Sequence, residues 1–246
     1  AQTLFEKALP TVIDFSSPRA WAFALVGIKG YLSRFSGDSE VRRIRERLAD
    51  KLLNLYRANA GDGWPWIEDR VAYANGRISH ALIRTGHCQG NAEMLEAGLA
   101  SLKWLMEIQT DPKGHFVPVG NNGWFLRGNK KSRFDQQPIE ALNMIEACRE
   151  AYETTGQAEW VSCAQRCVEW FLGRNDLNVP LYDHKTGGCC DGLHADGPNR
   201  NQGAESTLVC LLSLLHFNHL RSQQISVEDA GETVQENNPA VVTYGQ

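Results

Sequence analysis

Five carboxyl side chains lie where long polar segments of the sequence meet apolar, helix-like ones. They are Asp62, Asp135, Glu140, Asp191 and Glu205. Cleavage of a glycosidic bond typically needs two carboxyl groups, one protonated to help the leaving group and one ionised to activate water or to attack the sugar. We therefore expect Asp135 to act with Glu140 or Glu205 as a catalytic pair, and regard Asp191 as a further candidate catalytic residue.

Each of these acids also has a structural interpretation. Glu140 and Glu205 fall in the first turn of an expected helix, where a negative charge interacts favourably with the helix dipole. Asp135 could equally be an N-cap residue. The catalytic interpretation depends on the convergence of these acids on one face of the molecule.

The long polar segments, residues 59–74, 111–135 and 173–203, are rich in glycine, tryptophan, amide, arginine and acidic residues. An aromatic ring can cover the apolar side of a pyranose while polar side chains hydrogen-bond its hydroxyl groups. The candidate saccharide-binding residues are Trp64, Trp66, His80, Asn122, Trp124, Arg133, Gln136, Gln137, Arg200 and Gln202. The alternative is that the tryptophans plug the mouth of a helical array.

We expect no metal and no cofactor. Cys189, Cys190 and His194, with His87 and Cys88, could in principle bind zinc, but no C-x-x-C or H-x-x-x-H spacing is present. A cysteine nucleophile is disfavoured because nothing local points to an activated thiolate. The sequence also has no phosphate-binding loop or dinucleotide fingerprint.

Helical periodicity predicts an all-α fold of seven helices. The expected ranges are roughly 19–35, 40–58, 75–86, 91–110, 136–155, 158–172 and 204–221. The second range has one apolar stripe and a charged remainder, which is typical of an outer helix. The first and the seventh are apolar nearly all round, which predicts helices enclosed on most sides.

Short and long connections alternate between these helices, so antiparallel hairpins would bring all three long segments to one end of the molecule. His80, Glu140 and Glu205 fall in register when the helices after the long segments are aligned. This weak repeat is typical of toroids and solenoids. We expect the three residues at the N-terminal ends of inner helices.

Composition excludes several partners. The net charge is −4 and no block of Lys or Arg is present, which argues against nucleic acid and anionic membranes. No apolar run approaches the ~20 residues that cross a bilayer. Seven cysteines, mostly within helical patterns, favour a reducing, cytoplasmic compartment. We expect one domain at 18–222, an N-terminal linker or arm at 1–17 and a disordered acidic tail at 223–246.

Four motifs carry a resemblance to known proteins: "DGWPW" (62–66), "NNGW" (121–124), "FDQQPIEAL" (134–142) and "GGCCDGL…NRNQGAES" (187–206). With the helix order, they resemble the (α/α) toroids of carbohydrate-active enzymes, which include glycoside hydrolases, polysaccharide lyases and sugar epimerases. They also resemble a helical region found next to glycosyltransferase domains in bacterial polysaccharide proteins. The toroid resemblance implies that Asp135, Glu140, Asp191 and Glu205 lie at a sugar-binding mouth.

Three functions follow as expectations. The first is hydrolysis of a glycosidic bond in a bound oligosaccharide or polysaccharide. The second is a non-catalytic module that holds a glycan, a glycosyltransferase domain or a second copy. The third is a sugar epimerase, which would need a histidine base from among His80, His115, His184 and His194.

Seven helices are too few to close a complete toroid of this kind. An exposed apolar edge is therefore expected. It could be covered by a tighter ring, by a homodimer or by further helices of a longer protein.

Overall fold

The computed structural model of the chain describes residues 2–236, and the side chains of residues 2–227. All seven predicted helices are present, and the all-α class is confirmed because the strands have only two or three residues each. The helices are α2 (Pro18–Leu32), α3 (Ser39–Asn59), α4 (Asn75–Gln89), α5 (Ala92–Ile108), α6 (Pro138–Thr155), α7 (Glu159–Phe171) and α8 (Ala204–Glu236).

Local signals in the sequence explain where several helices begin and end. The Asp38 and Asn91 side chains cap α3 and α5 by accepting hydrogen bonds from the backbone N–H groups of Val41 and Met94, each at 3.0 Å. At the other end, α4 and α6 stop at Gly90 and Gly156. Both glycines have positive φ angles, 64° and 69°, a conformation that other residues seldom adopt.

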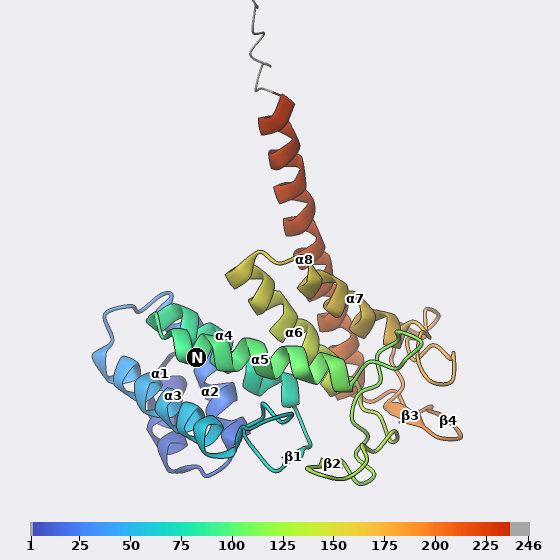
Figure 1. Cartoon of the computed structure of the whole chain (residues 1–246), viewed down its shortest axis with the longest axis horizontal. Helices are drawn as coiled ribbons and strands as arrows, with labels where there is room; N and C mark the ends of the chain where they lie inside the picture. The colour runs from blue at the N-terminus through green and yellow to red at the C-terminus, as the bar shows by residue number, and fades with distance from the viewer. Residues whose placement is uncertain (1, 237–246) are drawn as a thin grey trace, which may run out of the picture.

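The helices form two layers. The inner row consists of α2, α4, α6 and α8, each packed against the next, while α3, α5 and α7 lie outside it (Figure 1). Glycines allow α4 to approach its neighbours closely. A Cβ atom on Gly76 would lie 2.5 Å from the backbone of Asn143 in α6, and one on Gly98 of α5 would lie 2.7 Å from the backbone nitrogen of Ile83. The predicted outer position of α3 is confirmed.

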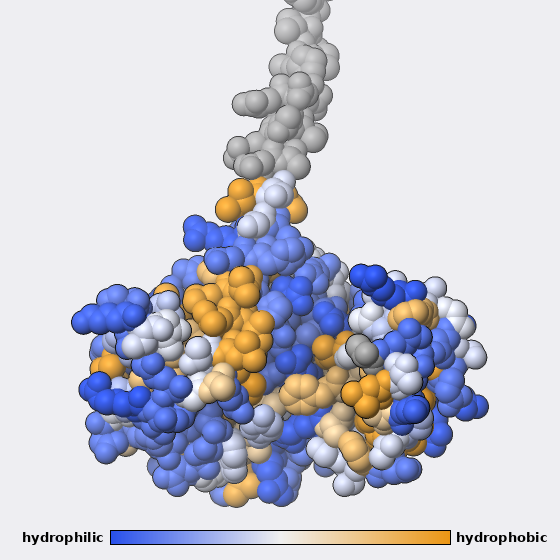
Figure 2. Space-filling model, turned by 180° about the vertical axis from the view of Figure 1, so that it is seen from behind, coloured by the Kyte–Doolittle hydropathy of each residue, from blue (hydrophilic) through white to orange (hydrophobic). Residues whose placement is uncertain are grey.

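The inner row has exposed apolar side chains at both ends. Phe23 of α2 is 43% exposed, and Leu208, Leu211 and Leu215 on α8 are 42–64% exposed. Figure 2 shows an apolar patch on the back of the molecule, below the protruding part of α8. The prediction that the first and seventh helices are enclosed on most sides is therefore wrong for these faces. Within the described residues, each inner helix packs against the next inner helix along the chain. The two ends of the row, α2 and α8, do not pack against each other to a comparable extent.

Both chain ends contain helices. Helix α1 (Gln2–Ala8) and the 3₁₀ helix η1 (Leu9–Asp14) form the expected linker or arm and fold onto the domain. Leu9 is buried, and the ring of Phe5 stacks on Tyr31 of α2 with a centroid separation of 4.8 Å. At the other end, residues 223–236 continue α8, whereas residues 237–246 lie outside the described part. The tail lacks apolar periodicity, but its Gln, Glu and Ala residues are good helix formers, so polarity alone did not imply disorder.

The three long loops lie at one end of the molecule, as predicted. β1 (Arg70–Val71) pairs with β2 (Phe125–Leu126) and joins the first loop to the second. A bridge between Gln136 and Leu193 joins the second loop to the third, within which β3 (Gly192–His194) pairs with β4 (Gly197–Asn199). In Figure 1, β1 and β2 lie at the bottom of the molecule, and β3 and β4 lie at its lower right. We call this end the loop face.

No helix within residues 2–236 has the length and apolar character needed to cross a membrane.

Candidate functional site

Two of the three predicted stacking tryptophans are buried. Trp64 is 6% exposed and Trp66 is fully enclosed. Their indole N–H groups donate hydrogen bonds to the backbone oxygens of Glu68 and Arg70, at 2.7 and 2.8 Å. Both rings pack against Trp104 of α5. The prediction that these two residues offer a surface to a sugar is wrong, because the large apolar rings complete the core beneath the first loop.

Glu140 is also enclosed, at 1% exposure. Its carboxylate accepts hydrogen bonds from the backbone nitrogens of Ala74 and Asn75, at 2.6 and 3.3 Å, and from the Asn75 side chain at 3.0 Å. Burial raises the pKa of Glu140 to about 7, although these hydrogen bonds oppose the shift. Glu140 therefore caps α4 from the neighbouring helix α6. The prediction that it faces the sugar-binding mouth is wrong.

His80 lies in the second turn of α4 and is 1% exposed. Its ring is held within a charged network between α4 and α6, where its Nε2 atom lies 3.5 Å from Glu150 and Arg84 binds the same carboxylate at 2.5 Å. Burial lowers the pKa of His80 to about 4, which keeps the ring neutral. His80 therefore does not lie at the loop face, although the sequence alignment placed it in register with Glu140 and Glu205.

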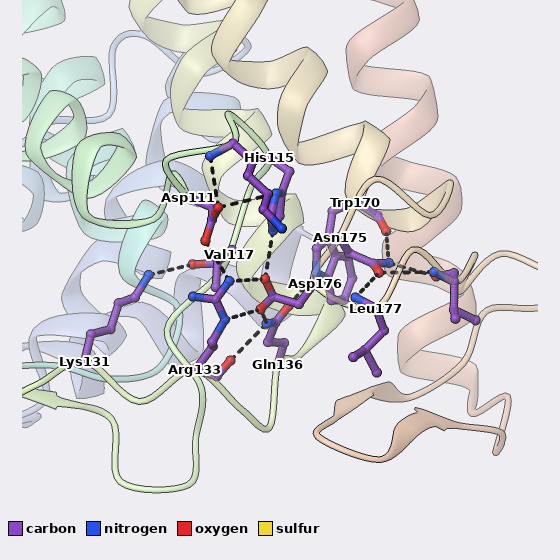
Figure 3. A network of polar contacts seen from close by, with 12 residues as sticks. Asp111, His115, Val117, Lys131, Arg133, Gln136, Trp170, Asn175, Asp176 and Leu177 are labelled. Atoms are coloured by element: carbon purple, nitrogen blue, oxygen red, sulfur yellow. Dashed lines mark hydrogen bonds and ion pairs between the residues drawn. The ribbon is translucent and has the colours of Figure 1, made fainter.

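Gln136 and Arg133 connect the second loop to the third (Figure 3). Gln136 is fully buried; it donates a hydrogen bond to Asp176 at 2.8 Å and accepts one from the Trp170 indole at 2.7 Å. The Arg133 guanidinium binds Asp111 at 2.7 Å and Asp176 at 3.0 Å. Gln136 cannot reach a ligand, and Arg133 already has two carboxylate partners. Both residues hold loops together.

Asp111, His115 and Asp176 form the one group in the described residues whose ligating atoms lie close enough to hold a metal ion. His115 Nε2 lies 2.8 Å from the Asp176 carboxylate, and Nδ1 lies 3.9 Å from Asp111. The positive charge of Arg133 already bridges the two carboxylates. A backbone hydrogen bond from Lys113 and, secondly, the hydrogen bond from Arg133 lower the pKa of Asp111. The group therefore works as a salt-bridge network between two loops (Figure 3).

Asp135 and His194 form a hydrogen-bonded pair that is open to solvent. The Gln136–Leu193 bridge places the two residues opposite each other on adjacent segments, one from each loop. Asp135 Oδ1 lies 2.5 Å from His194 Nδ1, and the side chains are 32% and 39% exposed. Nε2 of His194 has no hydrogen-bond partner in the described part of the chain. A carboxylate that orients an imidazole in this way can support general acid–base chemistry at the free nitrogen.

A hollow of about 750 Å³ opens at the loop face beside the starts of α2 and α4. Its aromatic lining consists of Tyr73, which is 41% exposed, and the half-buried Trp124. Its polar lining includes Arg19, Asn59, Glu68, Asp69 and Arg70. The sequence prediction missed Tyr73 and Asp69, although both lie in the predicted first loop.

Backbone hydrogen bonds connect the Trp124 turn to the segment that carries Asp135. The Asn121 nitrogen donates to the Asp135 carbonyl at 2.9 Å, and the Ser132 nitrogen donates to the Trp124 carbonyl at 2.9 Å. Asp135 of the acid–base pair and one aromatic wall of the hollow therefore belong to the same folded loop.

The remaining candidates divide into capping and exposed residues. Asp191 accepts hydrogen bonds from Asn201 and, at 2.9 Å, from the Gly203 nitrogen, so it fixes the segment that leads into α8. Ser206, in the first turn of α8, makes the hydrogen bond that lowers the pKa of Asp191 most. The exposed or half-exposed candidates are Asp62, Asn122, Gln137, Arg200, Gln202 and Glu205. Burial and, secondarily, the charge of Glu205 raise the pKa of Tyr73.

The chain matches no protein-family model, and no curated protein matches it in a comparison of sequences.

Proposed function

We propose that the protein binds a saccharide at the loop face and transfers a proton there through Asp135 and His194. The observation that carries this proposal is the 2.5 Å contact between Asp135 Oδ1 and His194 Nδ1, in a pair that is about one-third exposed. A proton-transfer group must be accessible to its substrate and held in one orientation. This pair meets both conditions.

Tyr73 and Trp124 are the proposed stacking surfaces, in place of the buried Trp64 and Trp66. They line the same hollow, whose volume suits a small saccharide. Asp69 and Arg70 are exposed beside them and supply hydrogen-bonding groups for sugar hydroxyls. The combination of aromatic faces with charged and amide groups supports a carbohydrate better than an apolar ligand.

The first proposed reaction is hydrolysis of a glycosidic bond, with Glu205 as the second carboxyl group. Glu205 is exposed in the first turn of α8 and has no ion-pair partner within the described residues. In this reaction the protonated Asp135–His194 pair assists the leaving group, and the Glu205 carboxylate activates water or attacks the sugar. Glu140, which is enclosed, has no part in this proposal.

The second proposed reaction is epimerisation, which one specific observation supports. Of the four histidines considered for a base, His194 is hydrogen-bonded to a carboxylate and partly exposed. His80 and His115 are buried. A base of this kind can remove a proton from the sugar carbon next to the carbonyl group of the open-chain form. The resulting enolate would then take up a proton from solvent on either face.

Binding and chemistry can be tested separately. Isothermal titration with a panel of oligosaccharides should detect binding that Tyr73→Ala or Trp124→Ala removes. Phe35→Ala is the matched control, because Phe35 is 40% exposed on the loop after α2, away from the hollow. Asp135→Asn should abolish turnover and retain binding. Binding that survives both aromatic substitutions would contradict the proposed site.

A non-catalytic module is the alternative outcome of the same experiment. In that case Asp135→Asn would bind the saccharide as well as the native protein does, and neither would convert it. A glycosyltransferase domain or a second copy would then be the proposed partner. The exposed leucines of α8 support additional helices at this edge, as in an (α/α) toroid completed by a partner or by more of a longer chain.

We also propose a cytoplasmic, bacterial origin in polysaccharide metabolism, a proposal that rests on the motif resemblance and on the cysteines. Five of the seven cysteines are buried, where a free thiol packs as a small apolar side chain. A reducing compartment favours this state.

A further inference from the structure

A second hollow lies away from the loop-face site, between the outer helices α5 and α7. Its volume is about 440 Å³, and its lining combines apolar side chains such as Met106 and Trp160 with the cations Lys103 and Arg166. Cys163 of α7 also lines it. Cys163 is 8% exposed, and the hollow gives a small molecule access to its thiol.

Two neighbours donate hydrogen bonds to the sulfur of Cys163. One is the buried thiol of Cys148 on α6, and the other is Nη2 of Arg166, which lies 3.1 Å from Sγ. These donors lower the pKa of Cys163, the Cys148 hydrogen bond having the larger effect, while the same contact raises the pKa of Cys148. The thiolate, which is the nucleophilic form of cysteine, is stabilised on Cys163 and disfavoured on its partner.

We propose that Cys163 is a site of oxidation by hydrogen peroxide, and that Cys148 converts the oxidised form into a disulfide between α6 and α7. The Cys163 thiolate attacks one peroxide oxygen, the O–O bond breaks, and the departing hydroxide takes up a proton to leave as water. Cys163 is then a sulfenic acid. The Cys148 sulfur attacks the Cys163 sulfur and displaces the hydroxyl group, which leaves as a second water with the Cys148 proton. One peroxide thus accepts two electrons from two thiols.

Arg166 fits this sequence in two ways. Its Nη2 group stabilises the initial thiolate, and its Nε atom is buried without a hydrogen-bond partner in the described residues. A sulfenic acid oxygen on Cys163 would supply an acceptor beside that unsatisfied donor. A buried donor without a partner is unfavourable, so an oxygen there would be stabilised.

The other cysteines lack this combination. Cys189 and Cys210 also interact through their thiols, but both are buried, and neither lines any of the hollows described here. Cys167 is buried as well, and Cys88 is exposed without a thiol neighbour. The Cys189–Cys210 pair is therefore a matched control for proximity, and Cys88 is a control for exposure.

Trypsin separates the relevant thiols, which makes the test direct. Cys148, Cys163 and Cys167 fall in the peptides 134–149, 150–166 and 167–174, while Cys88 falls in 85–103. The folded protein is treated with hydrogen peroxide, with and without dimedone to trap sulfenic acid, and is then alkylated, digested and analysed by mass spectrometry.

We expect a disulfide-linked species of peptides 134–149 and 150–166 that separates on reduction. Cys148→Ala should abolish this species and allow dimedone to accumulate on 150–166, whereas Cys189→Ala should leave it unchanged. Arg166→Gln removes the tryptic site between Cys163 and Cys167, so oxidation of this variant is measured on peptide 150–174, with fragmentation to assign the modified cysteine. Oxidation of Cys163 should be several-fold slower in this variant, and the far-ultraviolet circular dichroism of each variant confirms its fold. Oxidation of Cys163 no faster than that of Cys88 in the native protein would overturn the proposal. Sulfenic acid on Cys163 without the linked species would overturn the role of Cys148.

Discussion

Glu140 Oε2 accepts a hydrogen bond from the Asn75 side chain at 3.0 Å, which connects the first turn of α6 to the first turn of α4. The same carboxylate accepts hydrogen bonds from the backbone N–H groups of Ala74 and Asn75 at the start of α4. An acid that resembles a catalytic glutamate in the sequence is therefore a structural cap between two inner helices.

Replacement of Glu140 by Ala should lower the free energy of unfolding by about 1–3 kcal/mol, because buried donors at the start of α4 lose their acceptor. Urea denaturation measures this change. Glu205→Ala is the control, since Glu205 lies in the first turn of the next inner helix but is exposed, and its change should stay within about 0.5 kcal/mol. Equal effects of the two substitutions would contradict the capping role.

Stability should also depend on pH through Glu140. The pKa of Glu140 in the folded protein is about 7, above its ordinary value of 4.5, so the folded state retains a proton that the unfolded state loses. The unfolded state binds fewer protons between these values, and the free energy of unfolding contributed by Glu140 therefore falls as pH rises from 4.5 to 7. Denaturation midpoints measured across this range should fall less steeply in Glu140→Gln. An unchanged slope in the variant would rule out this assignment.

The Arg133 network should control the order of the second and third loops. Arg133→Gln removes the ion pairs to Asp111 and Asp176, so limited proteolysis and hydrogen exchange should increase within 111–135 and 173–203. Lys130→Gln is the matched control, because Lys130 is exposed on the same loop and makes no ion pair within the described residues. Similar protection in both variants would show that the network does not hold the loops together.

Substitutions of Trp66 and Trp124 should have different effects on stability and on saccharide binding. Trp66→Ala removes a fully enclosed ring and should cost about 3–5 kcal/mol of unfolding free energy. Trp124→Ala removes a half-buried ring that lines the hollow, so its main effect should be the loss of saccharide binding. Thermal denaturation and titration calorimetry on both variants test this difference. A Trp124 variant as unstable as the Trp66 variant would place Trp124 in the core as well.

The sequence predicted the helices well because their signals are local. Apolar periodicity located all seven, and residues such as Asp38 and Gly156 marked ends through capping chemistry. The common position of the long loops followed from the alternation of connection lengths. These features depend on neighbouring residues in the chain.

The site was harder to predict because its contacts are distant in sequence. Glu140 contacts Asn75 from 65 residues away, and Asp135 contacts His194 from 59 residues away. No spacing rule reveals such partners, so Asp135 and His194 were each considered as candidates while their pairing was not predicted. Composition likewise could not show that Trp66 points into the core and that Tyr73 lines the hollow.

The most direct test of the central claim is proton NMR of a saccharide panel incubated in deuterium oxide with the native protein and with His194→Gln. New anomeric signals report cleavage of a glycosidic bond, and loss of a ring C–H signal reports proton abstraction at carbon. Proton transfer through Asp135 and His194 predicts that the native protein changes at least one saccharide and that His194→Gln leaves it unchanged. Conversion of that saccharide at the same rate by both proteins, or by neither, would contradict it.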